Sequence, residues 1–98
     1  MTTPATTTST GFALGNMYIT PGAIDALVEA NQSAQEFLER HQRGDFGELD
    51  EHDQHENELS IREGFRILSA YRTAKAVRLW IITEADRSST TILLPEEY

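Results

Sequence analysis

The C-terminal segment holds the polar side chains that are best placed to do chemistry. Two apolar runs, Trp80 to Ile82 and Ile92 to Leu94, flank a short stretch that combines two acids, a guanidinium and hydroxyls. Short runs rich in β-branched and aromatic residues predict neighbouring buried strands joined by a tight loop. Loops at the end of a sheet often carry binding or catalytic groups. We therefore treat four residues of this loop as a candidate polar site: Glu84, Asp86, Arg87 and Ser88.

Two interpretations of this loop are open. In a small ribonuclease-like enzyme, a carboxylate takes the 2′-hydroxyl proton, an imidazolium protonates the leaving oxygen and an arginine stabilises the phosphorane. Glu84, Arg87 and either His41 or His55 supply those side-chain types. The formal net charge of −8 argues against this enzyme, because RNA-cleaving surfaces are usually basic. In the structural interpretation, which we favour, Arg87 is anchored by Glu84 or Asp86 and the serines satisfy backbone groups.

The histidines could form a metal site, but the pattern is incomplete. His52 and Glu56 lie one helical turn apart with His55 beside them, whereas a catalytic zinc needs three protein ligands. We predict no metal and no cofactor, since the chain also lacks a Gly-rich phosphate loop, a nucleophile elbow and a zinc knuckle. The structural interpretation puts His52 on the inner side of a helix and leaves His55 in solvent.

A similar choice arises at residues 41–47. His41 and Asp45 could pair as a catalytic dyad. However, Gly44, Asp45 and Gly47 are typical of a sharp turn between helices, and Phe46 would then enter the core. We favour the structural turn.

The strongest functional signal is an acidic stretch. Residues 45–63 hold eight of the sixteen acids and one base, Arg62. Acids spaced along a helix can present charge roughly as phosphates do, and they steer docking onto a basic groove. We therefore favour a non-enzymatic interaction protein that binds a partner protein with a basic surface and does not bind nucleic acid directly. A small regulator acting with a separate DNA-binding protein is a further possibility. The predicted protein-binding residues are Asp50, Glu51, Asp53, Glu56 and Glu58.

Periodicity and capping residues predict an α+β fold. Thr20 with Pro21 begins one helix and Asp50 begins another, which Gly64 ends. The fold is two helices packed on a three- or four-stranded antiparallel sheet, in the order β-α-α-β-β-β. The predicted helices cover 21–42 and 50–63, and the predicted strands cover 65–71, 77–83 and 90–94, with a weak first strand within 12–19. The predicted core is Ile24, Leu27, Val28, Leu38, Phe46, Leu59, Phe65, Ile67, Leu79, Ile81, Ile92 and Leu94.

Length and composition limit the possibilities further. The 98 residues predict one domain over 12–98, preceded by a Thr-rich tail, residues 1–11, for which we expect disorder. The chain has no cysteine, which fits a reducing cytoplasm, and no apolar run long enough for a membrane span. We expect a cytoplasmic protein with no membrane contact, as a monomer or small homo-oligomer.

Five segments between residues 14 and 98 are distinctive: Leu14-Gly15, Thr20 to Ala23, His41 to Gly47, Arg66 to Tyr71 and Trp80 to Tyr98. Together they resemble a family of short bacterial proteins described as plasmid-related. This resemblance implies a protein of plasmids and integrative elements, and it transfers no catalytic residue. The acidic stretch, the small size and the lack of a complete catalytic set suggest a protein that binds a host or element-encoded partner, as an inhibitor of a host defence complex that handles nucleic acid. Phe46 stands where the family has tryptophan, which leaves the turn interpretation intact.

Overall fold

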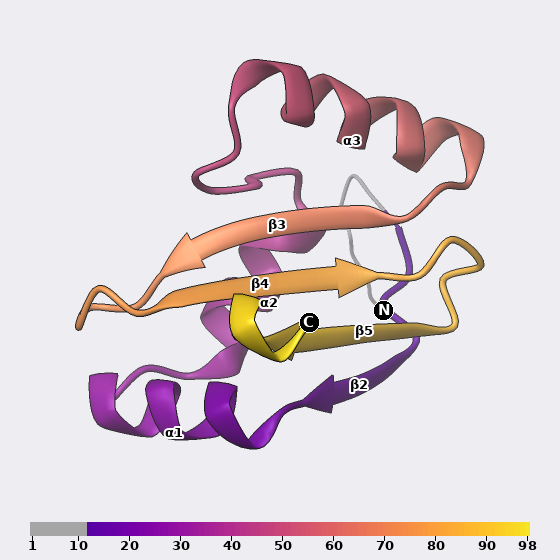
Figure 1. The fold of residues 1–98 in the computed structure, drawn as a ribbon. Helices are drawn as coiled ribbons and strands as arrows, with labels where there is room; N and C mark the ends of the chain where they lie inside the picture. Colours follow the sequence, from indigo (N-terminus) through magenta and orange to yellow (C-terminus); the bar gives the residue numbers. More distant parts are fainter. Residues whose placement is uncertain (1–11) are drawn as a thin grey trace, which may run out of the picture.

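A computed structural model describes residues 12–98 of the chain, so the predicted disordered tail, residues 1–11, lies outside the described part. The fold is α+β, as predicted, with three helices and a four-stranded sheet (Figure 1). The elements in chain order are β2 (Asn16–Ile19), α1 (Pro21–Ala30), α2 (Ala34–Gln42), α3 (Glu51–Glu63), β3 (Ile67–Arg72), β4 (Arg78–Thr83), β5 (Ser89–Leu93) and the 3-10 turn η1 (Pro95–Glu97).

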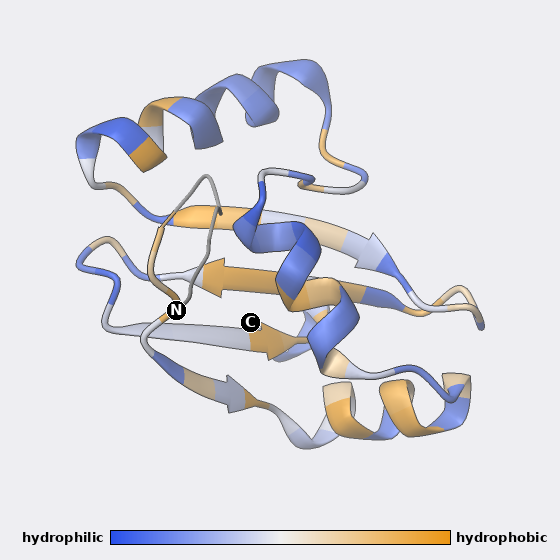
Figure 2. Cartoon of the chain, turned by 180° about the vertical axis from the view of Figure 1, so that it is seen from behind, coloured by the Kyte–Doolittle hydropathy of each residue, from blue (hydrophilic) through white to orange (hydrophobic). Residues whose placement is uncertain are grey.

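The sheet runs in the order β2-β5-β4-β3. β3, β4 and β5 form an antiparallel meander, but β2 pairs parallel with β5, so the sheet is not wholly antiparallel as predicted. α2 lies behind the sheet, α1 lies beside the β2 edge and α3 lies beside the β3 edge (Figures 1 and 2). η1 and the C-terminus lie on the other face of the sheet (Figure 1). The two faces of the sheet are therefore covered unequally.

The predicted helix over 21–42 is two helices, and the break has a local cause. Asn31 adopts the left-handed conformation with φ 55° and ends α1, which asparagine tolerates better than most residues. Ser33 then caps α2 by accepting a hydrogen bond from the backbone N–H of Glu36. The predicted caps at Thr20 and Asp50 and the stop at Gly64 are confirmed.

The core lies between α1, α2 and the facing side of the sheet. Seven predicted core residues are buried: Leu27, Leu38, Phe46, Ile67, Leu79, Ile81 and Ile92. Leu94 is half-buried and packs against this core. Four predictions were wrong, because Ile24, Val28, Leu59 and Phe65 are exposed.

The errors on α1 follow from which side of the helix meets the sheet. α1 turns Ala23, Ala26 and Leu27 inward, at helical spacing. Small alanine side chains allow the helix to approach the sheet closely, which leaves the larger Ile24 and Val28 outside.

Candidate functional site

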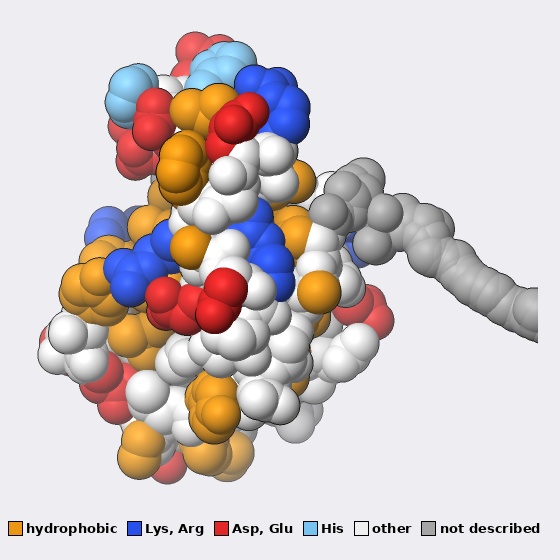
Figure 3. Space-filling view, turned by 90° about the vertical axis from the view of Figure 1, so that its right-hand side faces the viewer, with side chains coloured by type: hydrophobic (Ala, Val, Ile, Leu, Met, Phe, Trp, Pro, Cys, Tyr) orange, Lys and Arg blue, Asp and Glu red, His pale blue; other side chains and the backbone are white. Residues whose placement is uncertain are grey.

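The predicted acidic face lies on α3 and its N-cap and is exposed to solvent. Asp50, Glu51, Asp53, Glu56 and Glu58 are all exposed. Figure 3 shows acidic side chains gathered on this helix at the top of the molecule, with histidines among them. Because several of these acids lie in the first turns, they also complement the positive end of the helix dipole.

Few of these charges are compensated within residues 12–98. Glu58 lies 3.5 Å from the Nδ1 atom of His55, and the Asp50 carboxylate accepts the backbone N–H of Asp53 at 2.9 Å. No ion pair within the described range engages Glu51, Asp53 or Glu56. Glu51, Asp53 and Glu56 therefore have no basic partner among the described residues and can meet positive charge on another molecule.

α3 is attached to the sheet mainly by polar groups. The Asn57 side chain bonds Leu68 of β3 twice, with Nδ2 donating to the carbonyl at 2.6 Å and Oδ1 accepting the backbone N–H at 3.1 Å. Asn57 and Ser60 are the buried residues of this helix, whereas Leu59 is exposed. His52, which we placed on the inner side, is exposed as well, so that prediction was wrong. Asn57 holds the inner side of α3 and leaves the acidic side outward.

Arg87 provides the second attachment of α3. It adopts a left-handed backbone conformation with φ 61° in the β4–β5 loop. Its guanidinium donates to four backbone carbonyl oxygens, and the shortest bonds go to Phe65 at 2.6 Å and Ser60 at 2.8 Å. We predicted that the carboxylate of Glu84 or Asp86 anchors Arg87; Glu84 is one of the four partners, but through its backbone carbonyl, and none of the four is a carboxylate. A guanidinium can satisfy several converging carbonyls at once, and here it joins the end of α3 to the loop.

The other polar residues of the loop point to different partners. Glu84 lies 3.4 Å from Arg66, and the Asp86 carboxylate accepts the backbone N–H of Ser88 at 3.0 Å. Hydrogen bonds from Ser88 lower the pKa of Asp86. The four residues of the candidate polar site therefore do not converge on one point.

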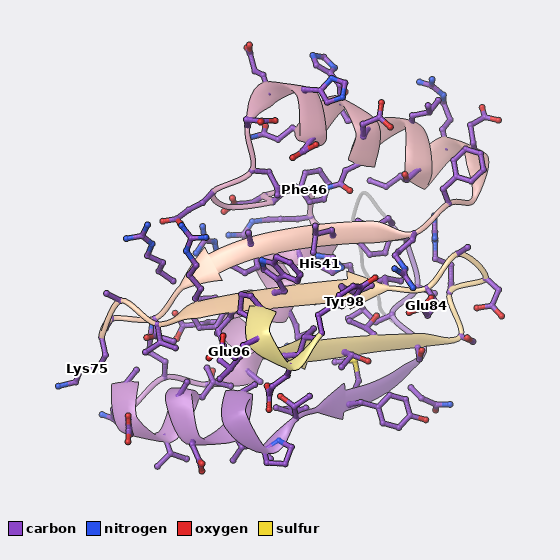
Figure 4. The ribbon with its side chains drawn as sticks, in the orientation of Figure 1. His41, Phe46, Lys75, Glu84, Glu96 and Tyr98 are labelled. Atoms are coloured by element: carbon purple, nitrogen blue, oxygen red, sulfur yellow. The ribbon has the colours of Figure 1, made fainter. Side chains whose placement is uncertain are left out.

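His41 is the centre of a buried polar network that joins α2 to three strands. The ring is completely buried, with Nδ1 2.5 Å from the Ser69 hydroxyl and Nε2 2.9 Å from the Thr83 hydroxyl. Thr83 contacts Thr90 at 2.7 Å, and Thr90 donates to the carbonyl of Leu14 at 2.7 Å. Figure 4 shows His41 inside the fold, whereas Glu84 lies near the end of β4.

The last bond of this network determines the direction of the others. Thr90 uses its one hydroxyl hydrogen on the Leu14 carbonyl, so Thr83 must donate to Thr90. His41 must then donate from Nε2 to Thr83. Burial lowers the pKa of the ring to about 4, so the ring is neutral at pH 7 and Nδ1 accepts the Ser69 hydroxyl hydrogen.

This geometry does not assemble the catalytic sets that the sequence suggested. Asp45 does not pair with His41; its carboxylate lies 2.8 Å from Arg40, which holds the pKa of Asp45 below its usual value. His41 is enclosed, and the Arg87 guanidinium already has its carbonyl partners. His55 lies on the exposed side of α3. Within residues 12–98, no group of three or more His, Cys, Asp or Glu side chains could hold a metal ion.

The sheet face opposite α2 carries an aromatic pair that sequence reasoning missed. The Trp80 and Tyr98 rings meet edge to face at 5.7 Å, and Arg66 donates to the Tyr98 hydroxyl at 2.7 Å. Beside them is a hollow of about 70 Å³, lined by Glu48, Ala70, Tyr71, Arg78 and Trp80. Pockets for small-molecule ligands usually enclose about 300 Å³ or more. This hollow is too small to serve as one.

Comparison with known proteins found no matching family model, curated protein or solved structure. The resemblance to plasmid-related proteins therefore stays a prediction from the sequence. None of the helices in the described part of the chain is long and apolar enough to cross a membrane.

Proposed function

We propose that this chain is a non-enzymatic interaction protein that binds a basic protein surface through the acidic face of α3. The observation that carries the proposal is the uncompensated exposure of this face. Its five carboxylates are exposed, and only Glu58 has a nearby basic side chain, His55, among the described residues. The face consists of Asp50, Glu51, Asp53, Glu56 and Glu58.

The attachment of α3 supports the same proposal. Asn57 and Arg87 hold its inner side and its C-terminal end through hydrogen bonds to backbone groups. A helix held in this way presents its outer charges in a constant geometry, and a preorganised surface loses less entropy on binding. Complementary charge raises the rate of association, most strongly at low salt.

The chemistry of the face suggests the class of partner. A protein surface that attracts a row of carboxylates is basic, and such surfaces commonly hold nucleic acid. We infer a cytoplasmic partner that handles nucleic acid, whose groove α3 occupies in competition with the phosphate backbone. The resemblance to plasmid-related proteins further suggests that the partner is a defence complex of the bacterial host and that the chain inhibits it.

A charge-neutralised variant tests the acidic face. Four acids of α3 are changed to their amides, and Asp50 is kept because it caps the helix. The matched control neutralises four exposed acids elsewhere, so both variants carry the same net charge. The test changes are Glu51→Gln, Asp53→Asn, Glu56→Gln and Glu58→Gln; the control changes are Asp25→Asn, Glu29→Gln, Glu39→Gln and Glu96→Gln.

Each protein is immobilised and used to capture partners from a bacterial lysate at low and high salt. We expect the wild type and the control to capture the same basic protein, the α3 variant to lose it, and added DNA or RNA to displace it. Equal capture by the α3 variant would refute the acidic face as the binding surface. Capture that nucleic acid leaves unchanged would refute the proposed groove.

A further inference from the structure

The two edges of the sheet are treated differently, and the β3 edge is closed. The outward backbone groups of Leu68 bond the Asn57 side chain. Those of Ala70 bond the loop before α3, with its N–H donating to the Phe46 carbonyl at 3.1 Å and its carbonyl accepting the Glu48 N–H at 2.7 Å. A closed edge cannot pair with a strand of another molecule.

The β2 edge is open. Asn16 and Thr20 donate their N–H groups to Ser88 and Ile92, so the even-numbered residues of this strand face β5. The alternation of a strand then directs the N–H and C=O groups of Met17 and Ile19 away from the sheet. No hydrogen bond to another described residue engages these four outward groups. In Figure 1 no helix or strand runs alongside β2 on its outer side, and α1 continues from its C-terminal end.

The surface around this edge is apolar. β2 carries no charged residue and no proline, and Met17, Tyr18 and Ile19 are 42%, 54% and 36% exposed. On the following helix, α1, the apolar side chains of Ile24 and Val28 are also exposed, at 46% and 71%. Apolar side chains are visible at the lower end of the molecule, where β2 and α1 lie (Figure 3). Natural proteins usually protect such an edge with charge, proline or a covering segment.

We propose that β2 pairs antiparallel with β2 of a second copy, about a two-fold axis at Tyr18. This register places Met17 opposite the partner's Ile19 and Tyr18 opposite the partner's Tyr18. Met17 and Ile19 carry the outward backbone groups, so both members of each facing pair can donate and accept, as a hydrogen-bonded antiparallel pair requires. The same patch serves both copies, which is the condition for a closed dimer. The two sheets become one sheet of eight strands.

The distribution of charge is compatible with this dimer. α3 lies at the β3 edge, so the two acidic helices lie at opposite ends of the joined sheet (Figure 1). Asp25 and Glu29 of α1 are exposed, and the Glu97 carboxylate accepts hydrogen bonds from Thr20 and Gly22, directly after β2. These acids repel across the interface, and salt screens that repulsion. Added salt should therefore strengthen the dimer, whereas it should weaken binding through α3.

The small number of side chains at the contact predicts a weak dimer. The exposed apolar side chains around the edge are those of Met17, Tyr18, Ile19, Ile24 and Val28. A standard interface buries about 800 Å² per partner. We therefore expect a weak dimer, with a dissociation constant of about 1–100 μM.

Sedimentation velocity over a range of concentrations tests the dimer. We expect the wild-type mass to rise from 11.0 kDa toward twice that value. Met17→Lys places a charge at the contact and should raise the dissociation constant at least about tenfold. Leu59→Lys is the matched control, because Leu59 is similarly exposed, at 39%, but lies on α3. A wild type that is monomeric at about 1 mM would overturn the proposal.

A disulfide tests the register. The chain has no cysteine, so Tyr18→Cys introduces a single thiol, which the two-fold axis places opposite its own copy. We expect rapid oxidation to a covalent dimer, at least about tenfold faster than for Leu59→Cys at equal concentration. Equal rates would overturn the register. Slow hydrogen exchange at Met17 and Ile19 in a monomeric wild type would show that another segment of the same chain covers the edge, and would also overturn the proposal.

Discussion

Buried His41 should make the stability of this protein depend on pH. Burial lowers its pKa from 6.5 in the unfolded chain to about 4 in the fold. Between these values the unfolded chain binds a proton that the folded ring does not, so acid favours unfolding. Above pH 6.5 this proton binding does not reduce the free energy of unfolding. The free energy of unfolding then falls as the pH decreases from 6.5 toward 4. Each unit of pKa difference is worth about 1.4 kcal/mol, so the whole change is about 3 kcal/mol.

Urea unfolding, followed by the fluorescence of the single tryptophan, measures this change. We compare the wild type with His41→Gln from about pH 7.5 to 4.5. Carboxylates titrate in both proteins, so the difference between their free energies of unfolding isolates His41. At neutral pH the variant loses buried hydrogen bonds to Ser69 and Thr83, at a cost of about 1–3 kcal/mol. This deficit should shrink as the pH falls.

The control is His55→Gln, which replaces an exposed histidine. If the free energies of unfolding of wild type and His41→Gln differ by the same amount at every pH, the assignment of a neutral, buried His41 ring is refuted. Titration of the His41 ring by NMR provides a second measurement if the variant does not fold. A midpoint near 6.5 in the folded protein would also refute the reasoning.

Three further changes test the contacts that position α3 and α1. Arg87→Ala should lower the free energy of unfolding in urea by about 1–3 kcal/mol, because the partly buried carbonyls of Ser60 and Glu84 lose their donor. Exposed Arg62→Ala should change that free energy by less than about 0.5 kcal/mol. Asn57→Ala should lower the free energy of unfolding by about 1–3 kcal/mol and speed amide hydrogen exchange on β3. Unchanged exchange would contradict the contact between Asn57 and the Leu68 backbone. Glu97→Gln should lower the melting temperature near pH 7 more than Glu96→Gln does, because hydrogen bonds lower the pKa of Glu97. The difference in melting temperature between the two variants should disappear as acid protonates the Glu97 carboxylate. A difference that persists at acid pH would contradict a stabilising role of the charged Glu97 carboxylate.

Local signals predicted the beginnings and ends of elements well. Thr20 and Asp50 cap helices because each side chain bonds a backbone N–H only three residues away. The break at Asn31 was equally local, and the Asn-Gln-Ser run before α2 contained its signal: a residue tolerant of positive φ followed by a capping serine. We interpreted the apolar stripe over residues 21–42 as one helix instead.

The candidate site was only partly predictable. The acids of α3 were identified because charge is a property of the sequence, and side chains on the outside of a helix need no partner. The groups that hold α3 in place were missed or given the wrong partners. Asn57 meets Leu68 eleven residues later, and Arg87 meets Ser60 twenty-seven residues earlier. No spacing rule connects such pairs.

The sequence by itself therefore determined the α+β class, the caps, the turn around Phe46 and the acidic stretch, because each depends on residues within a few positions of one another. Only the tertiary structure decided that β2 joins β5 in parallel across about seventy residues, that His41 is enclosed, and that one sheet edge is closed while the other is open. These features depend on which surfaces meet after the chain collapses. The pairing of distant backbone groups is decided by the packing of the whole fold, because every strand offers the same donors and acceptors.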